Sequence, residues 1–274
     1  MSHQNSLRIG GLGALTVAIL MLGLSCAIFD TSPGGDALEP IEGRVAFWVG
    51  ESHSHPGEEP MPTLFMSTEH VYPCCNYSIA CRVSRIGPLL DVEILGALRP
   101  EIGLCAIGPA FSMLPVDLTR AVEWIRFTLN GEREEFSVTL TDSSISVAGG
   151  QNRFMQLTRS LVWRYPPLSC SYECGTTGET SWICADFLDS LMASGLYRPF
   201  QFPDSGQIPY WGTTAGNSYV MPTCYFRYAR EEDFDLAGAM LERYARRAIN
   251  GHPGVRLSLL SWRNVQYTFL LLDD

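Results

Sequence analysis

Residues 124–140 read WIRFTLNGEREEFSVTL, and apolar and polar residues alternate on both sides of Asn130-Gly131. Alternation with a period of two places the apolar side chains on one face of a β-strand. Asn-Gly is typical of the two-residue turn that joins the strands of a hairpin. The stretch therefore predicts an antiparallel hairpin with one face in a core.

The segments before this hairpin have the same character. Short runs rich in β-branched and aromatic residues, separated by Gly and Pro, precede it. They are RVAFWV, LFMSTEHV, YSIACRVSRI and LLDVEILGAL. Regular turns without a helical period are typical of a sandwich. We expect an antiparallel β-sandwich of immunoglobulin-like size over residues 44–150.

From residue 151 onward two amphipathic stretches alternate with strand-like runs. SWICADFLDSLMASG (181–195) carries Ile183, Phe187 and Leu191 on one face, with Ser181 as the expected N-cap. EEDFDLAGAMLERYARRAINGHPG (231–254) has an acidic first turn and Arg246-Arg247 near its end, which suits the helix dipole. The order of elements predicts a ferredoxin-like α+β domain over residues 151–274. The fold class is therefore α+β and multidomain.

The first 29 residues form a signal, a lipoprotein signal or a membrane anchor. Residues 9–29 carry no charge and follow Arg8, whereas Asp30, Asp36 and Glu39 come after them. A positive end stays in the cytoplasm, so the remainder of the chain crosses the membrane. Residues 30–43, rich in Pro, Gly and acidic side chains, are expected to be a tether.

Three outcomes compete for this segment. LGLSC resembles a lipobox, in which cleavage precedes Cys26 and this cysteine is lipidated. Ser-Cys-Ala also meets the requirement for ordinary signal cleavage. An uncleaved anchor is the third outcome, because about 20 apolar residues span a bilayer.

The cysteine count favours lipidation. The chain has nine cysteines, and removing Cys26 leaves four in each expected domain. An even number per domain in an oxidising compartment indicates disulfides within each domain. The candidates are Cys74, Cys75, Cys81 and Cys105 in the first domain and Cys170, Cys174, Cys184 and Cys224 in the second.

Composition limits the kinds of partner. The formal charge is −10, every one of the 19 basic residues is Arg, and no basic cluster appears. Nucleic-acid binding needs a basic face, so we expect no nucleic-acid partner. The apolar fraction of 46% is sufficient for packed cores.

No motif predicts a catalytic residue, a metal site or a cofactor. His53 and His55, followed by Glu58 and Glu59, could chelate zinc or copper, but no third ligand follows at a diagnostic spacing. The spacing of Cys170 and Cys174 fits neither haem attachment nor thiol exchange.

The long loop at residues 204–218, DSGQIPYWGTTAGNS, is the best candidate for a contact with a partner. Its Gly and Pro residues disfavour helix and strand, and Tyr210 and Trp211 carry enough apolar area to anchor another protein. Long loops of this kind are often functional.

One part of the chain resembles a known group of proteins. Residues 72–147 resemble the N-terminal part of uncharacterised lipoproteins of environmental bacteria. The stretches that carry the resemblance are YPCCNYSIACRV, GLCAIGPAF and FTLNGEREEFSVTLTDSSISV. The resemblance covers under a third of the chain. It implies a lipid-anchored location and a β-rich first domain.

These observations favour a membrane-anchored, extracytoplasmic, non-catalytic protein of the bacterial cell envelope. It would bind another protein or serve as an accessory subunit of an envelope complex. The alternatives are an extracytoplasmic hydrolase with a site assembled from scattered residues and a module that binds carbohydrate or a small ligand. A pocket with convergent polar groups would favour the hydrolase.

Overall fold

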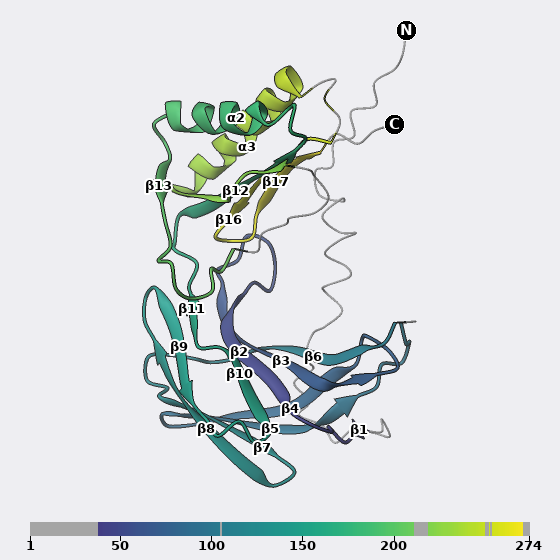
Figure 1. Ribbon diagram of the computed structural model, residues 1–274. Helices are drawn as coiled ribbons and strands as arrows, with labels where there is room; N and C mark the ends of the chain where they lie inside the picture. Colours follow the sequence, from purple (N-terminus) through teal and green to yellow (C-terminus); the bar gives the residue numbers. More distant parts are fainter. Residues whose placement is uncertain (1–37, 105, 211–218, 250–251, 253, 271–274) are drawn as a thin grey trace. The chain divides into compact units, whose positions relative to one another are not determined.

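The computed structural model describes residues 38–104, 106–210, 219–249, 252 and 254–270 (Figure 1). In this part of the chain 17 strands and two helices are present, so the protein is mostly β-sheet. The β-rich character expected from the sequence is therefore confirmed. Neither of these helices is long and apolar enough to cross a membrane.

The chain folds into two compact units. The first unit runs up to Val49 and includes Thr63–Thr139 and Val147–Ser160. The second unit contains Gly50–Pro62, Leu140–Ser146 and the chain from Leu161 onward. Residues 50–62 and 140–146, which the sequence analysis placed in the first domain, thus belong to the second unit. Residues 151–160, which it placed in the second domain, belong to the first unit.

Two sheets contain the strands of the first unit, and β11 at the edge of the larger one is assigned to the second unit. The larger sheet has the order β1-β5-β7-β8-β9-β11 with β4 also paired to β5, and the smaller one has the order β10-β2-β3-β6. The strands of the larger sheet are β1 (Leu38–Glu39), β4 (Ser78–Ile86), β5 (Leu89–Leu98), β7 (Trp124–Leu129), β8 (Glu132–Leu140), β9 (Ser144–Gly149) and β11 (Leu161–Trp163). Those of the smaller sheet are β2 (Val45–Ser52), β3 (Met61–Tyr72), β6 (Gly108–Pro115) and β10 (Met155–Arg159).

The predicted hairpin is confirmed. Strands β7 and β8 pair antiparallel from Trp124 opposite Ser137 to Leu129 opposite Glu132. Asn130 and Gly131 both have positive φ, at 53° and 81°. This is the conformation that a two-residue turn of the Asn-Gly type requires.

The sheets of this unit are not purely antiparallel, contrary to the expectation. β5 pairs parallel with β7, and β2 pairs parallel with β10. The chain leaves β5 for β6 in the other sheet before it returns as β7, so β7 can run in the same direction as β5. An aromatic contact joins the two sheets, because Phe47 of β2 lies 4.7 Å from both Phe127 of β7 and Phe136 of β8 between ring centroids.

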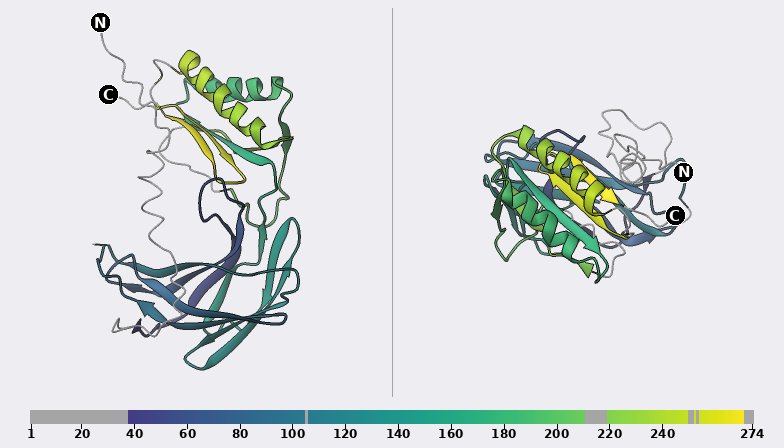
Figure 2. Two further views of the ribbon diagram at one scale, coloured as in Figure 1. Left: turned by 180° about the vertical axis from the view of Figure 1, so that it is seen from behind. Right: turned by 90° about the horizontal axis from the view of Figure 1, so that it is seen from above.

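A third sheet and both helices belong to the second unit. Its strands are β12 (Ser169–Thr176), β13 (Arg198–Phe200), β14 (Tyr219–Val220), β15 (Cys224–Arg227), β16 (Arg256–Ser261) and β17 (Gln266–Leu270). The order is β13-β15-β12-β16-β17, with β14 on β12, and all these pairs are antiparallel. Helices α2 (Trp182–Ala193) and α3 (Glu231–Ala248) lie on the same face of this sheet (Figure 2).

Both helices occupy the stretches that their periodicity indicates. In α2 the buried side chains include Ile183, Phe187 and Leu191. Ser181 precedes α2 but does not cap it through its side chain, because its hydroxyl donates to the carbonyl of Gly178. At the start of α3, Asp233 accepts from Arg230 twice, from its backbone N–H at 3.0 Å and from its guanidinium at 3.0 Å. The expected stop at residues 250–253 falls mainly outside the described residues.

Candidate functional site

Several predicted site residues lie outside the part of the chain that the structure describes. They are Cys26 in the N-terminal segment, Cys105 and Trp211. Lipidation of Cys26 and a partner contact through Trp211 therefore stay predictions. The remaining candidates can be placed.

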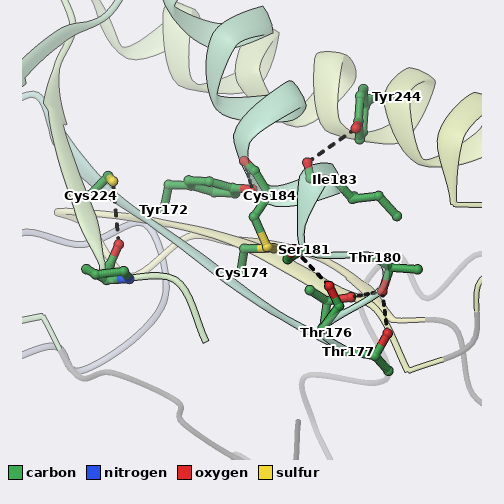
Figure 3. The surroundings of a disulfide bond; sticks show 12 residues. Tyr172, Cys174, Thr176, Thr177, Thr180, Ser181, Ile183, Cys184, Cys224 and Tyr244 are labelled. Carbon is green, nitrogen blue, oxygen red and sulfur yellow. Dashed lines mark hydrogen bonds between the residues drawn. A yellow bond between two sulfur atoms is a disulfide. The ribbon is translucent and has the colours of Figure 1, made fainter. Parts of the chain in front are cut away.

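A disulfide bond connects Cys174 of β12 to Cys184 of α2 (Figure 3). The two Cα atoms are 5.6 Å apart, within the usual range for a disulfide. Both cysteines belong to the second group of four, so the predicted class of bond is present within that group. The bond fixes the first turn of α2 to the sheet.

Tyrosine hydroxyls add to this attachment of α2. Tyr172 donates to the carbonyl of Cys184 at 3.1 Å, and Tyr244 of α3 donates to the carbonyl of Ile183 at 3.2 Å (Figure 3). In the loop that the disulfide closes, Thr180 hydrogen-bonds both Thr176 and Thr177. The surroundings of the disulfide are thus structural, since these hydroxyl groups are satisfied by their neighbours.

The other two cysteines of the second unit are thiols in the structure. Cys170 is buried in β12, and burial raises its pKa to about 12. Cys224 is half-buried near the carbonyl of Pro222, and burial raises its pKa as well. A thiol with a raised pKa carries little thiolate and is a poor nucleophile. The strand register explains the missing bond, because Cys170 is opposite Phe226 and Cys224 is opposite Tyr172.

The first group of cysteines is divided between a loop and a strand. Cys81 is buried in β4, whereas Cys74 is half-buried and Cys75 is exposed in the turn after β3. Gly103 and Gly108 approach Cys74 and Cys75 so closely that a Cβ atom would lie within 2.5 Å of the Cys74 Sγ and 2.9 Å of the Cys75 Cβ. The turn at residues 73–77 and the loop before β6 are therefore packed on each other.

A buried ion pair stands out among the titratable groups of the second unit. The side chain of Glu51 is 1% exposed, and its Oε1 accepts from Arg164 Nε at 2.6 Å. Its Oε2 accepts the backbone N–H of Tyr165 at 2.8 Å. Burial raises the pKa of Glu51, and the hydrogen bonds and charge of Arg164 oppose this only in part. The carboxylate therefore joins β2 to the segment after β11.

His53, the first of the two candidate metal-binding histidines, has a structural partner. Its Nε2 lies 2.7 Å from the carbonyl oxygen of Trp262, so this nitrogen donates. Burial lowers the pKa of His53, which keeps the ring neutral near pH 7. His55, Glu58 and Glu59 are exposed, and Glu59 pairs with Arg263 at 3.0 Å. Among the described residues no group of three possible ligands could hold a metal ion.

Tyr210, the described member of the predicted contact pair, is part of the core. Its side chain is 4% exposed, and its hydroxyl lies 2.7 Å from the Ser169 Oγ. The ring packs on Tyr165 and Tyr225, with centroids at 5.0 and 5.6 Å. The expected contact role therefore has to be corrected for this residue, because a ring enclosed in its own core offers no surface to a partner.

An exposed apolar surface occurs instead in the first unit. Val71, Ile102, Leu104 and Ile107 are 55%, 79%, 49% and 77% exposed, and we call them the apolar tip. Asn76 holds the loop that carries three of them, since its Nδ2 donates to the Ile102 carbonyl at 2.8 Å and its Oδ1 accepts the Leu104 N–H at 3.1 Å. Val71 lies opposite Pro109, and Tyr72 lies opposite Gly108, which follows Ile107.

Neither the Glu51–Arg164 pair nor the apolar tip is among the sites that the sequence predicts. The two members of the pair are 113 residues apart, so no local pattern connects them. The tip residues have the composition of a core strand. The signal that could have separated them is Pro100 and Gly103, which interrupt strand periodicity just where the apolar residues continue.

Comparisons with protein-family models, with curated proteins and with solved structures found no significant match.

Proposed function

We propose that this chain is a membrane-anchored, extracytoplasmic binding protein, or an accessory subunit, of a bacterial envelope complex. The observation that supports the proposal most is the disulfide between Cys174 and Cys184, in a chain whose uncharged residues 9–29 indicate export. Disulfides persist in oxidising compartments and are rare in the cytosol. Disulfide and export segment thus point to the same side of the membrane.

A non-catalytic role is supported by the use that the structure makes of its shifted groups. General acid–base catalysis needs a group with access to substrate and a pKa near the working pH. Glu51 is enclosed by Arg164 and Tyr165, His53 donates to a backbone carbonyl, and the Cys170 thiol has a pKa of about 12. Each of these groups is engaged in packing.

The finer fold assignment is part of the proposal. We infer a β-sandwich for the first unit, supported by the contacts of Phe47 with Phe127 and Phe136 across the two sheets. We infer a ferredoxin-like layer for the second unit. It is supported by the strand order β13-β15-β12-β16, by the helices that follow β12 and β15, and by β17 as an additional strand at the edge.

The proposed anchor is the lipid on Cys26, as the resemblance of residues 72–147 to bacterial lipoproteins also implies. Fractionation of cells that express the full chain, followed by intact mass measurement, tests this. We expect the mature protein in the membrane fraction, beginning at Cys26 and carrying the added mass of acyl chains. Cys26→Ala should remove that mass and leave the precursor uncleaved, whereas the matched change Cys224→Ala should do neither.

Two other results would redirect the proposal. A membrane-bound protein that still begins at its original N-terminus, and that Cys26→Ala does not affect, would replace lipidation by an uncleaved anchor. A cytoplasmic protein with Cys174 and Cys184 reduced would contradict the location altogether. Pull-down from solubilised membranes then tests for a stable partner, which the binding role requires.

A further inference from the structure

The apolar tip differs from the other exposed apolar side chains because its members are held together. Isolated apolar residues on a surface are normal, but a contiguous group marks an interaction site. The turn at residues 73–77 and the loop before β6 are joined through Asn76, and Gly103 and Gly108 lie against Cys74 and Cys75. Val71, Ile102, Leu104 and Ile107 are therefore presented together on two segments that support each other.

The N-terminal segment enters the first unit at the same end of the sheets. Leu38 of β1 is paired with Leu98, the last residue of β5, and Leu98 is also paired with Ser78, the first residue of β4. The loop with Ile102 begins directly after Leu98. Tyr77, which ends the 73–77 turn, donates its hydroxyl to the Glu39 carboxylate at 2.9 Å. Figures 1 and 2 show β1 and the adjoining ends of β3 and β6 toward one side of this unit.

The length of chain before Leu38 limits how far this end can move from an anchor. Eleven residues lie between Cys26 and Leu38, so their Cα atoms are twelve residue steps apart. At about 3.3–3.6 Å per residue, even a fully extended tether reaches only about 40 Å. A protein anchored at Cys26 therefore keeps the end of its sheets that carries the apolar tip within about 40 Å of the bilayer surface.

The charges around the tip favour an apolar contact over an electrostatic one. Arg99 and Glu101 flank the loop, Glu42 lies 4.0 Å from His70, and the chain has a formal charge of −10. Such a surface is not attracted to anionic lipid. Aliphatic side chains can nevertheless enter the boundary between headgroups and acyl chains whatever the lipid charge.

We propose that Val71, Ile102, Leu104 and Ile107 rest in the interface of the membrane that anchors the chain. This inference rests on the proposed anchoring and adds to it a second point of attachment. The tip and the tether then act together, because the tether keeps the tip at a high local concentration near the lipid. Two attachments fix the orientation of the first unit on the membrane, which a flexible tether alone does not.

Tryptophan substitution and brominated lipid test this contact. The full-length protein isolated from membranes is reconstituted into vesicles of zwitterionic phosphatidylcholine, with and without bromine on the acyl chains. Ile102→Trp is the tip variant, and Ile107→Trp is a second one should the first fail to fold. Ile86→Trp is the matched control, because Ile86 is 61% exposed at the opposite end of the β4–β5 pair.

We expect brominated lipid to quench the fluorescence added at residue 102 or 107 and to leave that added at residue 86 unchanged. Unquenched tip variants on protein that floats with the vesicles would overturn the tip contact and leave the anchoring intact. Protein that does not float with the vesicles would overturn both. An added tryptophan shielded from aqueous quencher but not reached by bromine would assign the tip to a second copy or another protein, and would also overturn the inference.

Discussion

Two buried glutamates show how differently the two units accommodate a charge. Glu134 in the first unit and Glu51 in the second are 3% and 5% exposed. Burial acts on both carboxyls, yet the pKa of Glu134 is lowered and that of Glu51 is raised. The presence of an opposite charge does not account for this difference, because the arginine lies beside Glu51.

The number of fixed donors explains the contrast. Glu134 accepts backbone N–H groups from Gln151, Arg153, Phe154 and Met155, at 2.5 to 3.4 Å. Glu51 accepts one backbone N–H and one guanidinium N–H. Hydrogen bonds to the charged form lower a carboxyl pKa. The first unit therefore holds a permanent anion with its backbone, whereas the second relies on one side-chain partner.

The largest expected difference between the two units comes from two matched substitutions. Glu134→Gln turns an amide N–H₂ toward backbone donors and should lower the free energy of unfolding by about 3 kcal/mol at pH 7. Glu51→Gln removes a charge that burial disfavours and leaves Arg164, whose side chain is 26% exposed, in contact with water, so the loss should stay within about 1 kcal/mol. Urea denaturation of both variants measures these values. Equal losses would show that the arginine stabilises as well as the backbone does.

The disulfide sharpens the comparison, because among the described residues it belongs to the second unit alone. Replacing Cys174 and Cys184 together by Ser should lower the stability of that unit by about 2–3 kcal/mol, the amount expected for a short loop. Cys224→Ser, at a half-buried thiol, is the control and should have a smaller effect. Calorimetry that finds the same loss in both variants would assign the effect to packing and not to the cross-link.

The opposite pKa shifts predict opposite responses to pH. Glu134 has a lowered folded-state pKa, so its contribution is present above the unfolded pKa near 4.5 and is lost as the pH falls through the folded value. Glu51 has a raised folded-state pKa, so stability declines as the pH rises from about 4.5 through that value. Each slope is at most about 1.4 kcal/mol per pH unit.

Unfolding titrations of the wild type, Glu134→Gln and Glu51→Gln separate the two contributions. Each substitution should remove one slope and leave the other. A Glu51→Gln variant that keeps the decline above pH 4.5 would mean that another group is responsible for it.

The smallest effect is expected from removing one buried hydroxyl group of the second unit, that of Tyr210. Tyr210→Phe keeps the buried ring and removes the hydrogen bond with Ser169, so it should cost about 1 kcal/mol. Tyr210→Ala should cost about 3–5 kcal/mol if the ring is core as the structure has it. Thermal unfolding distinguishes the two. An alanine variant as stable as the wild type would restore Tyr210 as an exposed contact residue.

The elements that the sequence predicts well are those determined by neighbouring residues. The Asn130-Gly131 hairpin follows from alternation and one dipeptide, and helices α2 and α3 follow from an apolar period of 3.6 and charged ends. The parallel pairing of β2 with β10 connects Val45 with Met155, and no local pattern carries that information. The burial of Tyr210 depends on contacts with residues far from it along the chain, such as Ser169, which explains why composition alone misplaced it.

The candidate surfaces show the same limit. An apolar residue in a strand core and one on an exposed loop are identical in composition, so only the neighbouring Pro100 and Gly103 indicate that Ile102 and Ile107 are exposed. What separates them is the clamp from Asn76, which is 26 residues from Ile102 along the chain. Conversely, the glycine-rich loop at 204–218 suggested an open surface, yet the hydroxyl of its first aromatic residue, Tyr210, is hydrogen-bonded to Ser169.

The route of the chain through the two units also sets the order in which they can form. Arg164, the partner of Glu51, is synthesised 113 residues after it. Trp262, whose carbonyl is the partner of His53, is synthesised 209 residues after it. At a synthesis rate of about 5–20 residues per second, the histidine remains without that partner for about 10–40 s. Residues 50–62 therefore stay without these partners, and accessible to proteases and chaperones, until almost all of the chain has been synthesised.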